Sequence, residues 1–195
     1  MIDFEYPEGA TPIDPDEAEG LLLPHIRTRA ELDRWEQENI HEAEDTVFRR
    51  KQKDILTEKY VCSLHKKMFG HVWRWAGEFR RSQKNIGIEW VQIPMALRQL
   101  FDDVSTWLEF DTYPPDEIAA RFHHRLVSIH AFPNGNGRHA RLIADIVLVH
   151  LLGQERFSWG QENLTNAGDC RRNYINALRS ADQHTYDPLL AFVRS

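Results

Sequence analysis

The sequence predicts one mainly α-helical domain with a single small β element. Long segments lack Gly and Pro and are dense in good helix formers, starting with residues 28–56. Apolar residues recur at helical spacing in several of these segments. Residues 71–94 differ, because Gly77 and Gly87 interrupt them and aromatic and β-branched residues are frequent. A length of 195 residues fits one domain.

The first 27 residues are acidic and contain several Pro and Gly, so we expect an irregular N-terminal arm followed by the domain at 28–195. The arm has neither the basic start nor the apolar core of a signal peptide. No apolar run approaches the roughly 20 residues that span a bilayer. We therefore expect a cytoplasmic protein without a membrane partner.

Helix boundaries follow from capping residues. Thr28 with Glu31 forms a capping box, and Thr57 caps a second helix that Gly70 ends. Residues 85–90, NIGIEW, predict a short β-hairpin or extended flap with Gly87 near its bend. Further helices are expected at 95–110, at 116–132 with Asp116 as cap, at 138–153, and once or twice within 161–195. The helix at 138–153 is the most apolar, so it should be the central and most buried one.

Composition limits the function. The net charge of −6 argues against nonspecific nucleic-acid binding, because neutralising phosphates needs a basic face. The two cysteines, Cys62 and Cys170, lack CxxC spacing, so no zinc site or redox pair is indicated.

Residues 130–141, HAFPNGNGRHAR, place a glycine-rich loop between two helices. Backbone N–H groups at such a loop and at the following helix start bind anions. Arg138 and Arg141 lie three apart, on one side of that helix, and a guanidinium matches phosphate oxygens. The segment therefore predicts a cradle for a di- or triphosphate.

His130 lies at the end of the preceding helix, where it suits a general base that takes a proton from a hydroxyl. Phe132 should anchor the loop in the core. Asn134 offers a carbonyl oxygen to Mg²⁺. A lone histidine or a Gly-Asn-Gly turn is more often structural, but the conjunction with both arginines favours a functional site.

HAFPNGNGRHAR resembles the signature of the Fic family, HxFx(D/E)GNGRxxR. The resemblance extends upstream through residues 64–80, across the flap at 85–94 and into the closing helices at 173–193. Within the family the chain is most similar to a subgroup called mobile mystery protein B, often encoded beside a helix-turn-helix protein.

The resemblance implies transfer of AMP from ATP to a Ser, Thr or Tyr hydroxyl of a target protein, with release of pyrophosphate. His130 would be the catalytic base. Gly135, Asn136 and Gly137 would hold the α- and β-phosphates, Arg138 the β-phosphate and Arg141 the γ-phosphate. The flap residues Ile86, Gly87, Ile88, Glu89 and Trp90 would hold the target segment as an added strand.

One position departs from the family pattern, because Asn134 stands where the family has Asp or Glu. A neutral amide should bind Mg²⁺ or Mn²⁺ more weakly than a carboxylate. The Doc branch, which transfers phosphate, has Lys where this chain has Gly137, so Gly137 favours AMP transfer. Two alternatives stay open, namely a weak or silent module that binds a nucleotide or partner, and transfer of another phosphate-containing group.

Family members are often inhibited by a helix with (S/T)xxxE(G/N), whose Glu pairs with the second arginine. SWGQEN contains Glu162 but lies between core helices, and RWEQEN contains Glu38 but has Arg34 instead of Ser or Thr. Glu36 and Glu38 fit a solvated charged face. We expect no internal inhibitor. Control would then come from a separate protein, such as a helix-turn-helix antitoxin in a toxin-type system, or from homodimer formation.

Several other residues invite two interpretations. His123, His124 and His139 could form a metal site, but packing roles are favoured. Asn173 and Tyr174 align with a helix that lines the adenine pocket in the family, with core packing as the alternative.

Overall fold

The computed structural model describes residues 14–160, 164 and 168–195. The elements in chain order are α1 (Pro15–Ala18), α2 (Arg29–Phe48), α3 (Glu58–Phe69), the 3₁₀ helix η1 (Trp90–Gln92), α4 (Ile93–Glu109), α5 (Pro115–Ile129), α6 (Asn136–His150), α7 (Asp169–Asp182) and α8 (Asp187–Val193). The expected helical class is confirmed.

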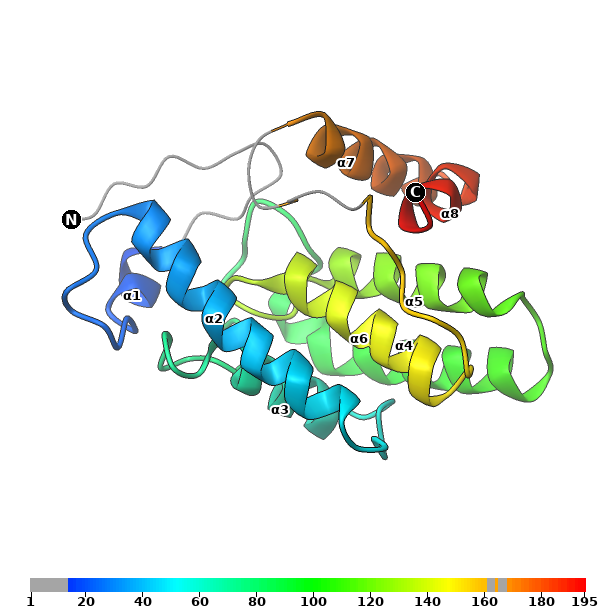
Figure 1. The fold of residues 1–195 in the computed structure, drawn as a ribbon, viewed down its shortest axis with the longest axis horizontal. Coiled ribbons are helices and arrows are strands. Elements are labelled where there is room, and N and C mark those ends of the chain that lie inside the picture. The colour runs from blue at the N-terminus through cyan, green and yellow to red at the C-terminus, as the bar shows by residue number, and fades with distance from the viewer. Residues whose placement is uncertain (1–13, 161–163, 165–167) are drawn as a thin grey trace.

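Helix α6 lies at the centre, as its apolar sequence predicted, because ten of its residues are buried. It packs against α5 and α3, and α2 also contacts it (Figure 1). Helices α4 and α5 lie side by side, and α7 with α8 covers the side of α5 away from α4. The buried apolar residues form two clusters. The larger one lies among helices α2 to α6, and the smaller one lies where α7 and α8 pack on α5 and α6.

The predicted caps of the first two long helices are confirmed. Thr28 accepts a hydrogen bond from the Glu31 N–H, and the Glu31 carboxylate accepts one from the Thr28 N–H. Thr57 caps α3 through the Tyr60 N–H. The prediction that Asp116 caps α5 is wrong, because Pro114 occupies that position and the Asp116 carboxylate binds the Arg194 guanidinium.

The predicted β-hairpin at the flap is also wrong. Residues 81–89 form bends and irregular backbone, and the described residues contain one isolated antiparallel bridge, Leu21 to Trp73, rather than paired strands. The physical reason is that the Arg80 side chain binds carbonyls of both flap arms, Ser82 and Ile88, which a hairpin would use for cross-strand bonds.

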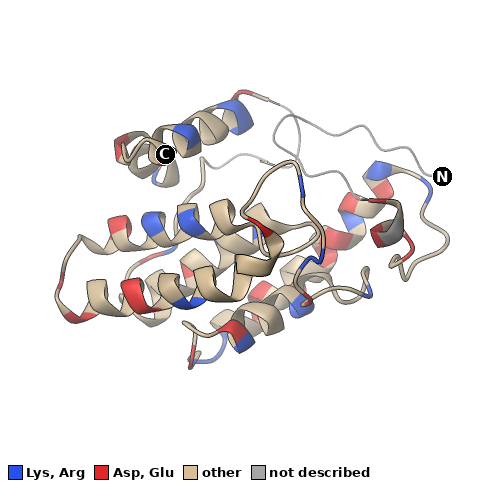
Figure 2. Cartoon of the chain, turned by 180° about the vertical axis from the view of Figure 1, so that it is seen from behind, with Lys and Arg blue, Asp and Glu red and all other residues tan. Residues whose placement is uncertain are grey.

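The described part of the segment before α2 contains one short helix. Helix α1 lies within residues 14–27, and the Trp75 indole donates to its Glu17 carbonyl. No helix of the described chain is both long and apolar enough to cross a membrane. Acidic and basic positions occur together along the same helices (Figure 2).

Candidate active site

A cavity of about 530 Å³ opens where the flap, the end of α5, the start of α6 and the face of α7 meet. It brings together most residues that the sequence singled out. The predicted residues that line it are Ile86, Gly87, Ile88, His130, Asn134, Gly135, Asn136, Gly137, Arg138 and Arg141. Glu89 and Trp90 are not part of this lining, and Trp90 is 41% exposed.

The loop between α5 and α6 is shaped by left-handed residues at both ends. His130 ends α5 with φ 54°, and Gly135 precedes α6 with φ 77°. The Asn136 side chain closes the loop, because it accepts from the Phe132 N–H at 2.9 Å and donates to the Phe132 carbonyl at 2.8 Å. Any contribution of Asn136 to phosphate binding would therefore come from its backbone N–H at the helix start.

His65 of α3 holds this loop from below. Its ring stacks on Phe132 at a centroid distance of 3.8 Å, and its Nε2 lies 3.1 Å from the Asn134 carbonyl. Its Nδ1 accepts from the Gly77 N–H, so the ring is the Nε2–H tautomer. Phe132 is buried, which confirms the expectation that it anchors the loop in the core.

His130 lies in the cavity as a neutral imidazole. Burial is the main cause that lowers the pKa of His130 to about 4, with smaller contributions from the positive charges of Arg80 and Lys84, while a hydrogen bond to the Val127 backbone opposes them. At neutral pH the ring is therefore unprotonated, the state that a general base requires.

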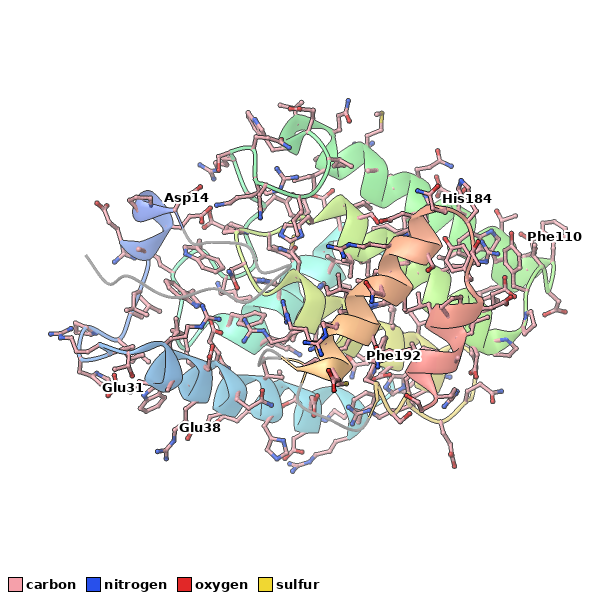
Figure 3. The ribbon with its side chains drawn as sticks, turned by 90° about the horizontal axis from the view of Figure 1, so that it is seen from above. Asp14, Glu31, Glu38, Phe110, His184 and Phe192 are labelled. Atoms are coloured by element: carbon pink, nitrogen blue, oxygen red, sulfur yellow. The ribbon has the colours of Figure 1, made fainter. Side chains whose placement is uncertain are left out.

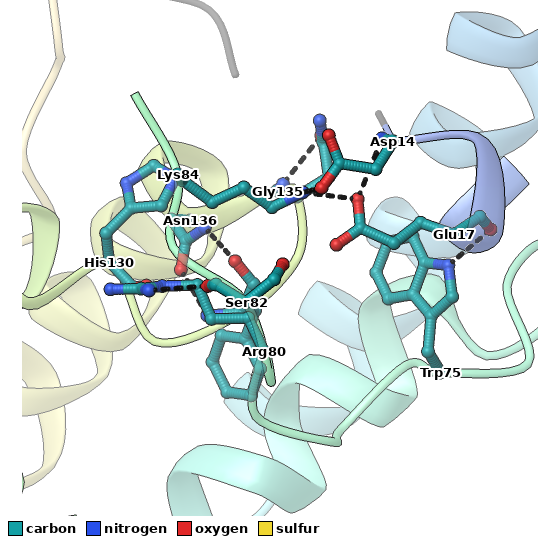
Figure 4. Close-up of polar contacts among 11 residues, drawn as sticks. Asp14, Glu17, Trp75, Arg80, Ser82, Lys84, His130, Gly135 and Asn136 are labelled. Carbon is teal, nitrogen blue, oxygen red and sulfur yellow. Dashed lines mark hydrogen bonds and ion pairs between the residues drawn. The ribbon is translucent and has the colours of Figure 1, made fainter. Parts of the chain in front are cut away.

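Arg80 joins the flap to His130 (Figure 4). Its Nε donates to the His130 carbonyl at 2.6 Å, and its two other nitrogens donate to the Ser82 and Ile88 carbonyls. Gly87 allows the flap to come this close, because a Cβ there would lie 2.6 Å from the His130 Cβ and its φ is +100°. Sequence reasoning missed Arg80, whose buried guanidinium carried no motif signal.

The flap is also tied to the N-terminal segment. The Lys84 side chain is only 3% exposed, and its Nζ lies 2.6 Å from both the Asp14 and the Glu17 carboxylates (Figure 4). This cluster brings a positive charge close to His130 and joins α1 to the flap.

The acidic partner of Arg138 is Glu36, and the prediction that Glu36 lies on a solvated face is wrong. Glu36 is 2% exposed rather than solvated, and its two oxygens lie 2.6 Å from Arg138 Nη1 and from the Trp73 indole nitrogen. The signal was its position, since Glu36 falls within the buried stripe of α2 that also holds Leu32 and Ile40. A charge at such a position predicts a buried partner.

Of the two candidate inhibitory residues, Glu38 does not line the cavity. Glu38 lies on the outer side of α2, directed away from the rest of the domain, and pairs with Arg34 at the surface (Figure 3). Glu162 lies outside the described residues.

The cavity wall contains arginines that the sequence motif does not include. Arg29 begins α2, and Arg171 lies in the first turn of α7. Arg171 donates to the Leu164 carbonyl at 2.7 Å, and Arg29 binds Asp33 at 2.9 Å. The Arg141 guanidinium lies 5.7 Å from the centre of the Tyr174 ring, which also lines the cavity.

Asn134 fits a metal ion poorly. Its Oδ1 accepts from the Gly135 N–H at 2.7 Å and lies 3.5 Å from Arg138 Nη2, so a cation would meet a neutral, engaged oxygen beside a guanidinium. Within the described ranges, no group of three or more His, Cys, Asp or Glu lies where it could hold a metal ion.

The histidine trio is not a metal site either. The three rings are buried and turn to different partners, His123 to the Tyr174 hydroxyl, His124 to Asp182 and His139 to the Val61 carbonyl. Packing roles are confirmed for them. Asn173 is exposed and is not part of the cavity lining.

The fold and the cavity define an all-helical domain in which a flap lies over a glycine-containing loop at the start of the central helix. Residues 55–148 match the model of the Fic/DOC family. The chain is 30% identical over 144 residues to "Protein adenylyltransferase Fic" of Aedes aegypti and 31% identical over 146 residues to that of Drosophila melanogaster. These matches cover 72% and 73% of the chain but 27% and 28% of the relatives. The chain thus spans little more than a quarter of these relatives' length.

Solved structures agree on the fold. The N-terminal Fic domain of a VirB-translocated Bep effector from Bartonella quintana superposes with a TM-score of 0.70 at 16% identity, covering 87% of this chain and 84% of that one. BepC of Bartonella tribocorum, solved with bound AMPPNP, gives 0.70 at 16% identity over 93% and 97% of the two chains. The chain belongs to the Fic/DOC family.

Proposed function

We propose that the protein is a protein adenylyltransferase that moves AMP from ATP to a hydroxyl side chain of a target protein. One observation carries this proposal, namely that a neutral His130 and the arginines Arg138 and Arg141 line one cavity. A base and a polyphosphate cradle in one cavity suit an attack by a hydroxyl on a phosphate ester.

In this reaction His130 takes the proton of the target hydroxyl as its oxygen bonds to the α-phosphorus. The bond from the α-phosphorus to the oxygen that bridges to the β-phosphate breaks. Pyrophosphate leaves with that electron pair, held by Arg138 and Arg141. Positioning and charge stabilisation supply most of the rate, because the protein forms no covalent intermediate.

ATP as donor is supported by the relatives named as adenylyltransferases and by the Bartonella structures with bound ADP or AMPPNP. Mg²⁺ or Mn²⁺ would enter the site bound to the donor's phosphates, and Asn134 is the candidate protein ligand for the ion. Because that ligand is neutral and engaged in the loop, no step of the transfer is assigned to the metal.

The target would meet the flap at Ile86 to Trp90. Exposed flap backbone near Ile86 and Gly87 can pair with an extended target segment and bring its hydroxyl to His130. Arg80 keeps that backbone in place from below. This mode reads the target backbone more than its side chains.

The biological setting of the protein is also part of this proposal. Membership of the mobile mystery protein B subgroup, a toxin-type role with a helix-turn-helix antitoxin, a homodimer and a cytoplasmic location all remain predictions. So does the lack of an internal inhibitor. Glu38→Gly should leave activity unchanged, whereas a large gain for Glu162→Gly would show that the chain inhibits itself.

The proposed function is tested by the intact mass of the purified protein after incubation with ATP and Mg²⁺ or Mn²⁺, with His130→Ala alongside. We expect a gain of one AMP mass, because members of this family commonly modify themselves, and no gain in the variant. A gain of one phosphate mass would establish the Doc-like alternative. No gain together with ATP binding would favour the silent module.

A further inference from the structure

Side chains, rather than backbone hydrogen bonds, hold the flap segment 81–88 in place. Among the described residues, no backbone–backbone hydrogen bond joins this segment to itself or to the rest of the domain. The buried Arg80 side chain holds the two ends of the segment through the Ser82 and Ile88 carbonyls. Between those ends, the flap is anchored by the buried side chain of Lys84.

The partners of Lys84 come from the segment before α2. Its Nζ lies 2.6 Å from Asp14 Oδ2 and 2.6 Å from Glu17 Oε2, which are 70 and 67 positions away in the sequence. The Glu17 carboxylate also accepts a hydrogen bond from the Asp14 N–H at 3.1 Å. Because the Glu17 side chain is 14% exposed and that of Asp14 is 48% exposed, solvent screens Glu17 less, and we expect it to be the stronger partner.

This segment is attached to the domain by contacts that do not involve Lys84. The Trp75 indole donates to the Glu17 carbonyl at 3.0 Å, and the Arg74 N–H donates to the Gly20 carbonyl at 2.8 Å. A Cβ at Gly20 would lie 2.5 Å from Trp75 Cδ1, so glycine allows the segment to lie this close. The segment around α1 is therefore a fixed support to which the flap is tied.

The tie lies close to the proposed base. In Figure 4 the Lys84 side chain extends from the flap toward the carboxylates of Asp14 and Glu17. Gly87, three positions after Lys84, packs against His130. After burial and the charge of Arg80, the charge of Lys84 also contributes to lowering the pKa of His130, so the ammonium lies within electrostatic reach of the ring. Displacement of the flap at Lys84 would move the backbone that faces His130.

We propose that Glu17 and Asp14 are positioning residues of the active site, which hold the flap in place for the target segment by binding Lys84. The inference rests on the proposed function in taking the flap as the surface that meets the target and His130 as the base. A target strand brings its hydroxyl to His130 only if the flap backbone that pairs with it stays in place. The described residues 14–27 are then part of the substrate site, although none of them lines the cavity.

The test compares wild type with Lys84→Met and with the combined variant Glu17→Gln/Asp14→Asn, as full chains at pH 7.5. Without nucleotide, trypsin should cut after the exposed Arg81 about fivefold faster or more in both variants, because a loosened flap reaches the protease more often. At saturating ATP with Mg²⁺, the initial rate of AMP gain by intact mass should fall by about tenfold, because the acceptor is misplaced. The Kd of ATP by calorimetry should change by less than about threefold, because Arg138 and Arg141 are untouched.

Matched controls are Glu19→Gln on the same segment and Lys53→Met, both exposed residues, which should match wild type in all three measurements. Lys84→Met combined with both carboxylate changes should be no worse than Lys84→Met alone, because the three side chains act as one unit. Losses that add up in this combined variant would overturn the inference. A Kd of ATP that rises as much as the transfer rate falls would also overturn it, because the tie would then support the whole cavity rather than the flap.

The two proposals fail separately, because cutting at Arg81 is measured without nucleotide. If the variants loosen the flap but wild type transfers no AMP, the tie stands and the adenylyltransferase proposal falls. If wild type transfers AMP and trypsin cuts the variants at the wild-type rate, the proposed function stands and this inference falls.

Discussion

Glu36 and Arg138 form an ion pair across 102 positions of the sequence, with Glu36 Oε2 lying 2.6 Å from Arg138 Nη1. The pair joins the middle of α2 to the first turn of α6. Since the Trp73 indole holds the other Glu36 oxygen, the carboxylate is fixed and in turn fixes the guanidinium at the cavity wall. The pair thus orients Arg138, which is the residue proposed to bind a phosphate group of the donor.

Glu36→Ala should destabilise the domain by about 3 kcal/mol, because removing one partner of a buried pair leaves the other charge without compensation. It should also weaken ATP binding, because Arg138 loses its orientation. Urea denaturation and calorimetry measure the two effects. Glu38→Ala, two positions away and exposed, is the control and should change the free energy of unfolding by less than about 0.5 kcal/mol. Equal effects of both variants would contradict the assignment.

His130→Ala should abolish transfer while ATP still binds. In the wild type, kcat/KM should stay on its plateau down to about pH 5, because the pKa of His130 is lowered to about 4 and the ring remains a competent base. Lys84→Gln removes a nearby positive charge and should move the acid limb to higher pH, with exposed Lys53→Gln as control. An acid limb near pH 6.5 in the wild type would show that His130 is not in this environment.

Gly87→Ala should impair transfer strongly, because the new Cβ would lie 2.6 Å from the His130 Cβ and 2.9 Å from Arg80 Nη2. The matched control is Gly153→Ala, which also has a positive φ, +64°, but meets no atom within 4 Å. Both variants carry backbone strain of about 1 kcal/mol. Initial rates compared at equal folded fraction would separate the clash from the strain. Similar rates for both variants would mean that the flap does not lie on His130.

The domain should lose stability as pH falls from about 6.5 toward 4. Burial lowers the pKa of His123 to about 3 and those of His130 and His139 to about 4, so over this range the unfolded chain binds more protons than the folded one. Each histidine then contributes up to about 1.4 kcal/mol per pH unit. Denaturation at pH 5, 6 and 7.5 measures the slope.

Asp145 opposes this trend. Burial raises its pKa to about 6, so its contribution to stability is greatest at low pH and is lost as pH rises through that value. Asp145→Asn should therefore steepen the acid loss, apart from any overall change caused by altering its hydrogen bonds to Trp159 and Phe157. A stability that does not vary between pH 5 and 7.5 in the wild type would contradict the histidine assignment.

Asn134→Asp should create a metal requirement. The carboxylate can keep the hydrogen bond from the Gly135 N–H and adds the negative charge that a hard cation needs. We expect ATP to bind this variant more weakly than wild type in EDTA and to recover in Mg²⁺, measured by calorimetry. Asn85→Asp on the exposed flap controls for charge alone. An EDTA response equal to that of the wild type would exclude Asn134 as a metal-facing position.

Much of the fold could be predicted because its signals are local. The Thr28 and Thr57 caps, the apolar face of α6 and the glycine-rich loop before it all depend on residues within a few positions of one another. The hairpin prediction failed because it used local strand propensity alone. The Arg80 side chain binds the Ser82 and Ile88 carbonyls of the flap, and strand propensity does not include such contacts.

The candidate site divides in the same way. The sequence by itself determined the loop with His130, Arg138 and Arg141, because residues joined by one tight turn must face one cavity. Only the tertiary structure decided which distant residues join them. Glu36, Arg80, Arg29 and Arg171 reach the cavity through the packing of α2, the flap and α7 on the central helices. The packing of distant helices decides which charged side chains become partners. Spacing along the chain can indicate that a charged residue such as Glu36 is buried, but it does not identify the partner.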